Sequence, residues 1–285
     1  MDIAIAGWTI TDDINGDPLL KPIVFHPEPL SLDEATRQLP EGAYTTFRTY
    51  RRFQIVNLTD HINRLEETAR LADHPLSLNR AALKKALHIA FMAFPSDQKR
   101  VRVILDLTRD VGSLYILIEK LVVPSKEEYE NGVAIITRRL QRNNPKAKLT
   151  DFIKTAEDVR QELPPGVHEV IMLDEHQQVL EGLSSNFFAI KSGVIWTANE
   201  GILAGITRQT VLNIIQAQGI PIKFAGINVD EISDLDEAFL TSTSRAILPV
   251  REIDGLLIGD GHPGKITRSI MTAYRAEIEH HLEVV

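Results

Sequence analysis

The segment that decides the fold reads Glu181-Gly-Leu-Ser-Ser-Asn-Phe-Phe-Ala-Ile-Lys-Ser-Gly-Val-Ile-Trp-Thr197. Its apolar run at 187–191 and the shorter run at 194–197 flank Ser192-Gly193, which predicts a β-hairpin. The polar stretch at 181–186 links this hairpin to a strand expected at 168–173. A helix is predicted at 207–218, where Gly219 ends it. Strands and a helix therefore follow one another within a short stretch of chain.

The rest of the chain continues this mixture. A hairpin is predicted at 43–56 from its aromatic and β-branched residues. Helices are expected at 61–72, 77–94, 149–162 and 265–282, and further strands at 100–108, 113–123, 133–137, 221–224, 238–241 and 249–253. Strands outnumber helices and mix with them, so the pattern predicts an α/β fold with α+β character rather than a helical bundle.

A polar stretch without periodicity, residues 124–132, separates two halves of the chain. The chain has 285 residues, and domains average about 100–200 residues, so two domains are expected. We predict a smaller N-terminal domain at 1–123, a linker at 124–132 and a larger domain at 133–285.

Composition and charge narrow the classes of function. The chain has no cysteine, which excludes disulfide scaffolds, thiolate nucleophiles and Cys-ligated metal centres. Its 31 Lys+Arg against 39 Asp+Glu give a net charge of −8, which disfavours nucleic-acid and anionic-membrane binding. The first residues carry Asp2, Asp12, Asp13 and Asp17 in place of the cationic start of a signal peptide, and no apolar stretch approaches the ~20 residues of a membrane span. We expect a cytoplasmic protein that acts on small molecules.

Two stretches that look like binding motifs have plainer interpretations. Gly259-Asp-Gly-His-Pro-Gly264 matches G-x-G-x-x-G, but the chain is too short after Gly264 for the βαβ unit of a dinucleotide site. We interpret it as a turn followed by a helix cap. His280 and His281 are adjacent and point about 100° apart on a helix, so they do not form a metal pair. The sequence predicts no metal site, and it contains no hydrolase, P-loop or zincin motif.

Four short segments of the second half carry residues suited to one kind of cofactor. They are Pro145–Lys148 just before a predicted helix, Glu181–Asn186 between strands, Gly205–Arg208 at a helix start, and Thr241–Ser244 at a strand end. A lysine, a loop carboxylate, a helix N-terminus and a hydroxyl-rich turn suit an aldehyde cofactor that bears a phosphate. The helix start offers unpaired N–H groups to an anion.

The quoted segment, with Gly201-Ile-Leu-Ala-Gly-Ile-Thr-Arg208, Phe239-Leu-Thr-Ser-Thr-Ser-Arg-Ala-Ile-Leu-Pro-Val250 and Ile253-Asp-Gly255, resembles the fold-type IV aminotransferases. This family of pyridoxal-phosphate enzymes includes branched-chain and D-amino-acid aminotransferases and aminodeoxychorismate lyase. The resemblance is densest over 145–270 and extends more weakly to 42–50 and 60–65. It implies two domains with pyridoxal 5'-phosphate at their junction, amino acid and 2-oxo acid substrates, ping-pong kinetics and a homodimer.

The resemblance also implies roles for single residues. Lys148 matches the lysine that bonds the cofactor aldehyde, with Lys146 as the alternative, and Glu181 matches the carboxylate at the pyridine nitrogen. Leu203 matches an apolar residue that backs the ring. The implied phosphate contacts are Arg64, Ile206, Thr207, Ser242 and Thr243. Without the family, a surface or core role would explain each of these residues.

The chain departs from its relatives where substrate specificity is set. Branched-chain aminotransferases have a tyrosine five residues after the lysine, but this chain has Ile153, and it lacks the Arg-x-His pair of D-amino-acid aminotransferases. The candidate substrate residues are Tyr44, Arg109, Tyr115 and Ser244. Thr45-Thr46 resembles aminodeoxychorismate lyase, which leaves pyruvate elimination as an alternative to amino transfer. A non-catalytic cofactor-binding paralogue is the other alternative.

Overall fold

The computed structural model describes residues 5–12 and 17–285. Asp2 and Asp13, two of the acidic residues that disfavour a signal peptide, lie outside the described residues. The chain divides into two compact units. Unit 1 comprises 1–122, 147–155 and 279–285, and unit 2 comprises 123–146 and 156–278. Unit 1 therefore includes two short segments from the second half of the sequence.

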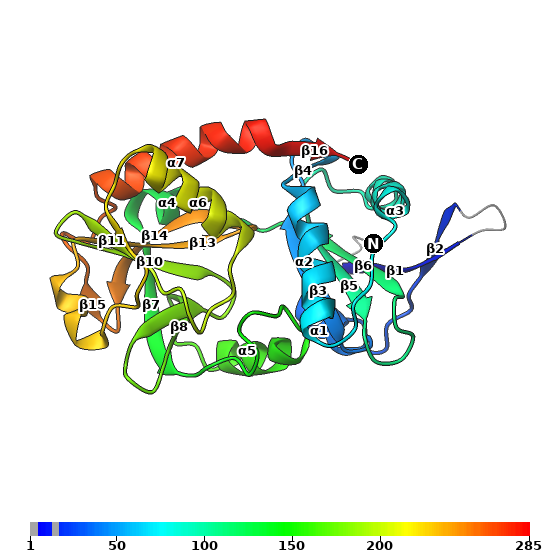
Figure 1. Cartoon of the computed structure of the whole chain (residues 1–285), viewed down its shortest axis with the longest axis horizontal. Helices are drawn as coiled ribbons and strands as arrows, with labels where there is room; N and C mark the ends of the chain where they lie inside the picture. Colours follow the sequence, from blue (N-terminus) through cyan, green and yellow to red (C-terminus); the bar gives the residue numbers. More distant parts are fainter. Residues whose placement is uncertain (1–4, 13–16) are drawn as a thin grey trace. The chain divides into compact units, whose positions relative to one another are not determined.

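Unit 1 is built on an antiparallel sheet of five strands in the order β2-β1-β6-β5-β3 (Figure 1). The strands are β1 (Ile5–Asp12), β2 (Pro18–Pro22), β3 (Gly42–Arg48), β5 (Lys99–Asp106) and β6 (Leu114–Lys120). Adjacent side chains of a strand alternate between the two faces of a sheet, so each strand serves two separate cores.

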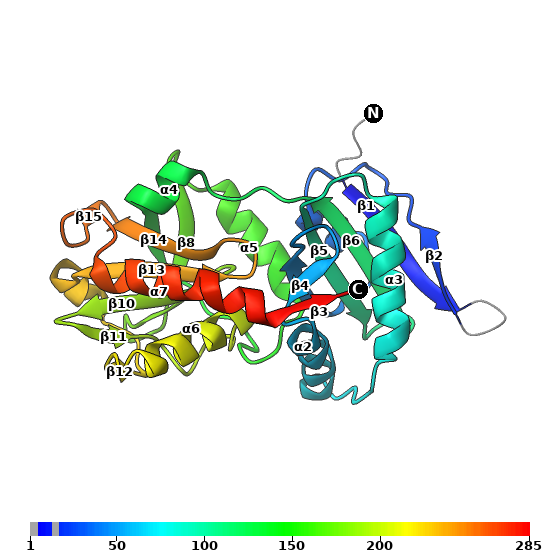
Figure 2. The same ribbon diagram turned by 90° about the horizontal axis from the view of Figure 1, so that it is seen from above.

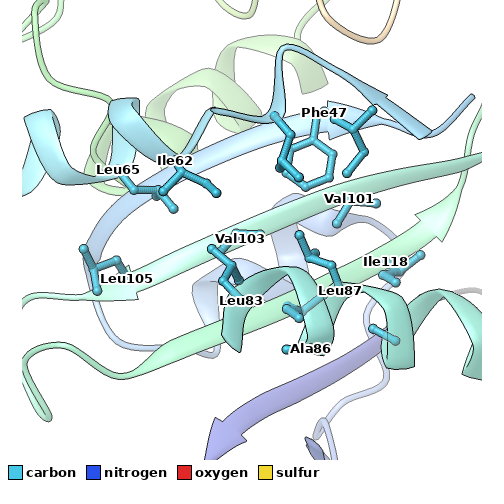
Figure 3. Packing of buried hydrophobic residues seen from close by; sticks show 14 of the residues in the cluster. Phe47, Ile62, Leu65, Leu83, Ala86, Leu87, Val101, Val103, Leu105 and Ile118 are labelled. Carbon is cyan, nitrogen blue, oxygen red and sulfur yellow. The ribbon is translucent and has the colours of Figure 1, made fainter. Parts of the chain in front are cut away.

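One face of this sheet is covered by α2 (Leu58–Leu71) and α3 (Arg80–Ala93). Figure 2 shows α3 running along the sheet. Leu83 and Leu87 of α3 pack with Val101 and Val103 of β5, as Figure 3 shows from close by. The apolar spacing of both helices at three and four residues produces this continuous buried stripe, and the expected helices at 61–72 and 77–94 are confirmed.

The opposite face packs against α1 (Leu32–Arg37), a helix that the sequence reading missed among the early turns. Ser31 caps its first turn by accepting a hydrogen bond from the amide of Glu34. Tyr44 of β3 and Ile104 of β5 are directly opposed on this face, and Tyr115 of β6 is opposite Ile104. Tyr44 and Tyr115 therefore lie in one cross-strand row.

The predicted hairpin at 43–56 is confirmed only at its tip, where Tyr50 and Gln54 form an antiparallel bridge across the turn at Arg51-Arg52; its two strands have other partners. The segment contains β3 and β4 (Gln54–Val56), but β3 pairs with β5, and β4 pairs with β16 (Leu282–Val284). Arg51 and Arg52 have φ angles of 44° and 69°, a left-handed conformation in which the chain turns away from the β3 ladder. The predicted helix at 265–282 also ends earlier, because its last residues form the short 3₁₀ turn η2 (Ile278–His281) and β16.

Unit 2 contains a mixed sheet of nine strands (Figure 1). The main path is β12-β11-β10-β13-β14-β7-β8-β9, with β15 (Leu256–Leu257) paired to β14. The strands of the path are β7 (Val133–Arg139), β8 (Val167–Leu173), β9 (Val179–Gly182), β10 (Asn186–Lys191), β11 (Val194–Trp196), β12 (Ile222–Lys223), β13 (Glu237–Ser242) and β14 (Ala246–Ile253). One further pair, Asn186 with Glu181, joins β10 to β9, so six strands close into a ring.

Alternating residues of the ring strands form two cores. Phe187 of β10 and Leu240 of β13 pack in one core, while Phe188 and Phe239 stack at a ring-centroid distance of 4.8 Å in the other. The second core also contains apolar residues of α6 (Ile206–Ala217) and α7 (Lys265–Glu277), which lie beside each other (Figure 2). The remaining elements of the chain are α4 (Lys126–Asn131), α5 (Asp151–Gln161) and the 3₁₀ turn η1 (Val229–Asp234).

The segment expected to link two domains contains α4, which begins at a capping box between Ser125 and Glu128. In the described residues no helix is long and apolar enough to cross a membrane. The α/β class with α+β character that the sequence predicts is confirmed.

Candidate active site

Lys148 lies just before α5 in a segment that is bound to the end of β3. Its carbonyl accepts a hydrogen bond from the amide of Tyr44 at 2.9 Å, and its own amide donates to Thr68 Oγ1 at 3.2 Å. Thr150 completes the attachment, because its amide donates to the Gly42 carbonyl and its hydroxyl accepts from the Gly42 amide. These hydrogen bonds on both sides of Lys148 fix the position of its backbone, and therefore the point from which its side chain extends.

The side chain of Lys148 is half-buried, and its Nζ lies 4.7 Å from the centre of the Tyr44 ring. An ammonium over an aromatic face is attracted by the quadrupole of the ring. Lys146, the alternative candidate, is exposed. Burial and anchoring therefore favour Lys148 over Lys146 as the residue with a specific task.

His61 of α2 is a buried neighbour of this lysine that the sequence reading did not select. Its Nδ1 is 2.6 Å from Thr45 Oγ1, and burial lowers its pKa to about 3, with further lowering by the charges of Arg64 and Lys148. The imidazole is therefore uncharged at neutral pH. Its His-x-x-Arg spacing to Arg64 was the signal that could have identified it.

Arg64 lies on α2, one helical turn after His61. Two acidic residues follow it on the same helix. Glu66 accepts from the Leu78 amide and pairs with Arg80, and Glu67 pairs with Arg70. The charge of Arg64 contributes to lowering the pKa of Glu67, after the hydrogen bond from Arg70. The role of Arg64 in phosphate binding stays a prediction.

Glu181 of β9 is 2% exposed and lies at the closure of the six-strand ring. Its Oε1 is 3.0 Å from Arg142 Nε, and its Oε2 accepts hydrogen bonds from Asn186 Nδ2 at 3.0 Å and the Leu203 amide at 3.1 Å. Both carboxylate oxygens therefore have partners, one of them a guanidinium. The arrangement fixes the carboxylate at a defined point inside unit 2.

The same contacts position Leu203 and the start of α6. Asn186 Nδ2 also donates to the Leu203 carbonyl at 2.7 Å, so one amide holds both Glu181 and the segment that leads into the helix. A Cβ atom on Gly205, the N-cap of α6, would lie 2.2 Å from Asn186 Oδ1. Only glycine fits at this position, which explains why this helix begins without a side-chain cap.

The helix starts of α6 and α7 differ in how their amides are used. No side chain caps α6 at Ile206 and Thr207, the predicted phosphate contacts. At α7, Glu237 accepts hydrogen bonds from the amides of Ile266 and Thr267. The interpretation of Gly259–Gly264 as a turn and a helix cap is confirmed, because a carboxylate of the protein already occupies that helix start.

Ser242 and Thr243, the other predicted phosphate contacts, lie in the turn between β13 and β14. Ser242 Oγ accepts hydrogen bonds from both the amide and Nε of Arg245. Arg245 Nη2 in turn lies 2.8 Å from Glu169 Oε2, which also accepts from the hydroxyls of Ser184 and Ser185. Burial raises the pKa of Glu169, but Arg245 and the other donors lower it more, so the carboxyl has a pKa below its usual range.

Three of the predicted substrate residues belong to unit 1. Tyr44 is 7% exposed and lies between Lys148 Nζ and the guanidinium of Arg102, whose Cζ is 5.0 Å from its ring centre. Tyr115 shares the row of Tyr44, and burial together with Asp106 and Asp110 raises its pKa. Arg109 is exposed on the turn after β5, where its amide donates to Asp106. Ser244, the fourth candidate, belongs to the β13–β14 turn of unit 2.

Each unit therefore gathers its own set of candidate residues. Unit 1 brings Lys148, Tyr44 and His61 together, with Arg64 on the same helix as His61, and leaves Arg109 apart on its turn. Unit 2 joins Glu181, Leu203 and the start of α6 through Asn186. The sequence reading missed Arg142, His61, Glu169 and Arg245, because the residues that contact them are far away along the chain.

Comparison with known proteins identifies the family. Residues 42–253 match the sequence model described as amino-transferase class IV. The D-alanine aminotransferase of Bacillus licheniformis is 28% identical over 274 residues, which cover 87% of this chain and 92% of that protein. A protein of Thermotoga maritima named "Probable branched-chain-amino-acid aminotransferase" is 29% identical over 245 residues, which cover 82% of this chain and 85% of that protein.

A solved structure shows the same fold. The branched-chain amino acid aminotransferase of T.th., solved with pyridoxamine 5'-phosphate, superposes with a TM-score of 0.77 at 20% identity, covering 98% of each chain. This structure confirms the predicted fold, and the family model confirms the resemblance and the cofactor class that it implied. The chain belongs to the class IV aminotransferases, a family of pyridoxal-phosphate-dependent enzymes.

Proposed function

We propose that this aminotransferase uses Lys148 to bond pyridoxal phosphate and to move the proton at the substrate Cα between an amino acid and a 2-oxo acid. The observation that carries this proposal is the anchoring of Lys148 to β3 and to Thr68, with Nζ over the Tyr44 ring. An amine used for proton transfer must be held at a defined position beside the substrate Cα. The contact with the Tyr44 ring face and the anchored backbone supply such a position.

The donor set of unit 2 fits the chemistry of this cofactor. Bound pyridoxal phosphate supplies an aldehyde that links to amines and a ring that accepts the electron pair left by Cα–H cleavage. We propose that Glu181, held in place by Arg142, Asn186 and the Leu203 amide, keeps a proton at the ring nitrogen. Leu203, 7% exposed, would then back the ring.

Phosphate binding is proposed for groups that offer hydrogen-bond donors. The start of α6 at Ile206 and Thr207 lacks a side-chain cap, and Asn186 occupies the place of a Cβ at Gly205. Both acceptor lone pairs of Ser242 Oγ are engaged by Arg245, so this hydroxyl is directed to act as a donor. Thr243 and the guanidinium of Arg64 complete the proposed set.

The amino donor is proposed to be a D-amino acid or an apolar, branched-chain-like amino acid. The two relatives named above act, by their names, on D-alanine and on branched-chain amino acids. The lyase reaction is the alternative proposal, since Thr45-Thr46 resembles the lyase; in the structure Thr45 contacts His61 and Thr46 accepts a hydrogen bond from Arg102. Tyr44, Tyr115, Arg109 and Ser244 are proposed to line the substrate site.

The test is a visible absorbance spectrum of the protein loaded with pyridoxal phosphate, recorded before and after addition of single D- and L-amino acids. We expect one donor class to convert the band of lysine-bound cofactor into that of the aminated cofactor. The same donor must then support amino transfer to a 2-oxo acid. A loaded protein that is inert to every donor, but releases pyruvate from aminodeoxychorismate, would replace amino transfer by the lyase reaction.

A homodimer in the cytoplasm is also proposed, on the strength of the family resemblance. Light scattering of the eluting peak in size-exclusion chromatography measures the mass directly. A mass of about twice 31.9 kDa would support the dimer, and a mass of one chain would contradict it.

A further inference from the structure

The β13–β14 turn and the β9–β10 loop of unit 2 are joined by one arginine. Arg245 Nε donates to Ser242 Oγ in its own turn at 3.2 Å. Its Nη2 reaches Glu169 at 2.8 Å and Ser184 Oγ in the other loop at 2.9 Å. Its carbonyl accepts from the Tyr129 hydroxyl, so both ends of the residue are held. The guanidinium therefore has a defined position between two loops.

The donor groups of Arg245 are only partly used by these contacts. A guanidinium has five N–H groups in a planar fork. Nε uses one for Ser242, and Nη2 uses two for Glu169 and Ser184. Within residues 5–12 and 17–285, no hydrogen bond is formed by Nη1, and the side chain is 16% exposed. Two N–H donors of a fixed arginine thus remain available to a molecule from solution.

Residues assigned above to the cofactor lie in or next to both loops that Arg245 joins. Ser242 is the last residue of β13 and Thr243 follows it in the turn, while Glu181 lies in β9 shortly before Ser184. A substrate that reacts at the cofactor must come close to these loops. Nη1 offers charge-assisted N–H donors, and every amino acid and 2-oxo acid carries a carboxylate that can accept from such a donor.

We propose that Arg245 binds a carboxylate of the amino acid or 2-oxo acid substrate and so sets which acids the enzyme accepts. This inference rests on the proposed function, because it needs Ser242, Thr243 and Glu181 to lie at the cofactor. Glu169 is the positioning residue, because it holds Nη2 of the guanidinium. The bound carboxylate is either the one on Cα, common to all substrates, or a second one at the far end of a dicarboxylic acid.

Removing Arg245 alone would leave Glu169 as an unpaired buried charge, which destabilises the fold. The test variant is therefore Arg245→Met combined with Glu169→Gln, which removes both charges and keeps both volumes. Glu169→Gln alone tests the positioning role, because it retains the guanidinium but removes the charge that holds it; we expect a smaller loss of acid binding than in the double variant. Arg251→Met is the control, since Arg251 is an exposed arginine on β14, the strand that follows the turn of Arg245.

Two readouts are needed on the protein loaded with pyridoxal phosphate. The first is the dissociation constant of two unreactive acids, propionate and glutarate, measured by calorimetry. The second is the KM and kcat for pyruvate, 2-oxoglutarate and the carboxylate-lacking acceptor propanal. We expect the dissociation constant of the recognised acid to rise about ten- to a hundredfold in the double variant, as for the loss of a charged hydrogen bond. The KM and kcat for propanal are expected to stay unchanged.

Which of the two acids binds more weakly to the double variant identifies the substrate carboxylate that Arg245 recognises. Weaker binding of both propionate and glutarate supports recognition of the Cα carboxylate, and weaker binding of glutarate alone supports the distal one. Unchanged binding of both acids overturns the proposal, as does a double variant that loses the cofactor instead. A wild-type protein that never binds pyridoxal phosphate would overturn the proposed function itself, which the visible spectrum reveals before any acid is added.

Discussion

The two units hold their candidate charges in opposite ways. In unit 1, Lys148 lies over the Tyr44 ring and near the uncharged imidazole of His61. In unit 2, Glu181 and Glu169 are buried against arginines, amides and hydroxyls. The amine of unit 1 is thus held against an aromatic face, and the carboxylates of unit 2 each receive several donors. The difference suits the proposed proton-transfer group in one unit and the proposed partner of the ring nitrogen in the other.

The largest effect is expected for Lys148→Ala in unit 1. The variant removes both the bond to the cofactor and the proton-transfer group, so kcat falls by about 10⁴-fold or more. The visible band of lysine-bound cofactor disappears as well. Lys146→Ala, which changes an exposed lysine two residues earlier, is the matched control and keeps both properties. Full turnover by Lys148→Ala with loss in Lys146→Ala would exchange the two assignments.

The next effect belongs to the carboxylate of unit 2. Glu181→Gln keeps the shape of the side chain but removes the charge opposite Arg142, so we expect kcat to fall by about 10²-fold. The buried arginine loses its ionic partner, and the free energy of unfolding falls by about 3 kcal/mol. Steady-state kinetics and urea unfolding measure the two quantities. Glu175→Gln, at an exposed site, is the control. A stable variant with normal kcat would mean that the negative charge is unnecessary.

A pair of glycine substitutions separates the two helix starts within unit 2. Gly205→Ala places a Cβ 2.2 Å from Asn186 Oδ1, and Gly264→Ala places one 2.2 Å from the Glu237 carboxylate. Each clash costs about 1–3 kcal/mol of folding stability. We expect only Gly205→Ala to weaken the affinity for pyridoxal phosphate, by about tenfold, in a fluorescence titration. Equal weakening by both variants would remove the distinction between α6 and α7.

The smallest effect concerns the pH dependence of stability in unit 1. The folded-state pKa of His61, about 3, lies below the ordinary value of 6.5, so the unfolded chain binds more protons between these limits. The contribution of His61 is complete above pH 6.5 and is lost as the pH falls toward 3, by at most about 1.4 kcal/mol per pH unit.

Urea unfolding at pH 7, 6, 5 and 4 measures this slope. We expect His61→Asn to flatten it relative to the wild type, while His176→Gln, at an exposed histidine, leaves it unchanged. An identical slope in His61→Asn and the wild type would show that His61 takes up its proton in the folded state, and unit 1 would then hold a third cation near Lys148.

Local sequence patterns were sufficient to predict most of the helices and strands. Helix spacing at 61–72 and 77–94 and the apolar runs at 100–108 and 187–191 predicted elements that the structure contains, because burying one face requires that periodicity. The pairing of the strands could not be predicted from the sequence. The segment 43–56 has the composition of a hairpin, yet β3 pairs with β5 and β4 with β16, since pairing depends on residues far along the chain.

In the candidate site, too, some features were predictable from the sequence and others were not. Order and spacing of short motifs were sufficient to predict the family and the cofactor, because a covalent lysine, a ring carboxylate and a phosphate-binding helix start each require particular residue types. Those motifs also selected Lys148, Glu181 and the start of α6, whose roles remain proposals. They did not reveal what surrounds these residues.

Only the tertiary structure showed that Arg142 pairs with Glu181, that Thr45 contacts His61, and that Arg245 joins two loops through Glu169. It also showed that residues 147–155 and 279–285 pack with unit 1, although they follow residues of unit 2 along the chain. A sequence determines which chemical groups are present and which faces of a segment are apolar. Burial, charge pairing and pKa depend on neighbours brought together from distant positions, and folding alone decides which neighbours those are.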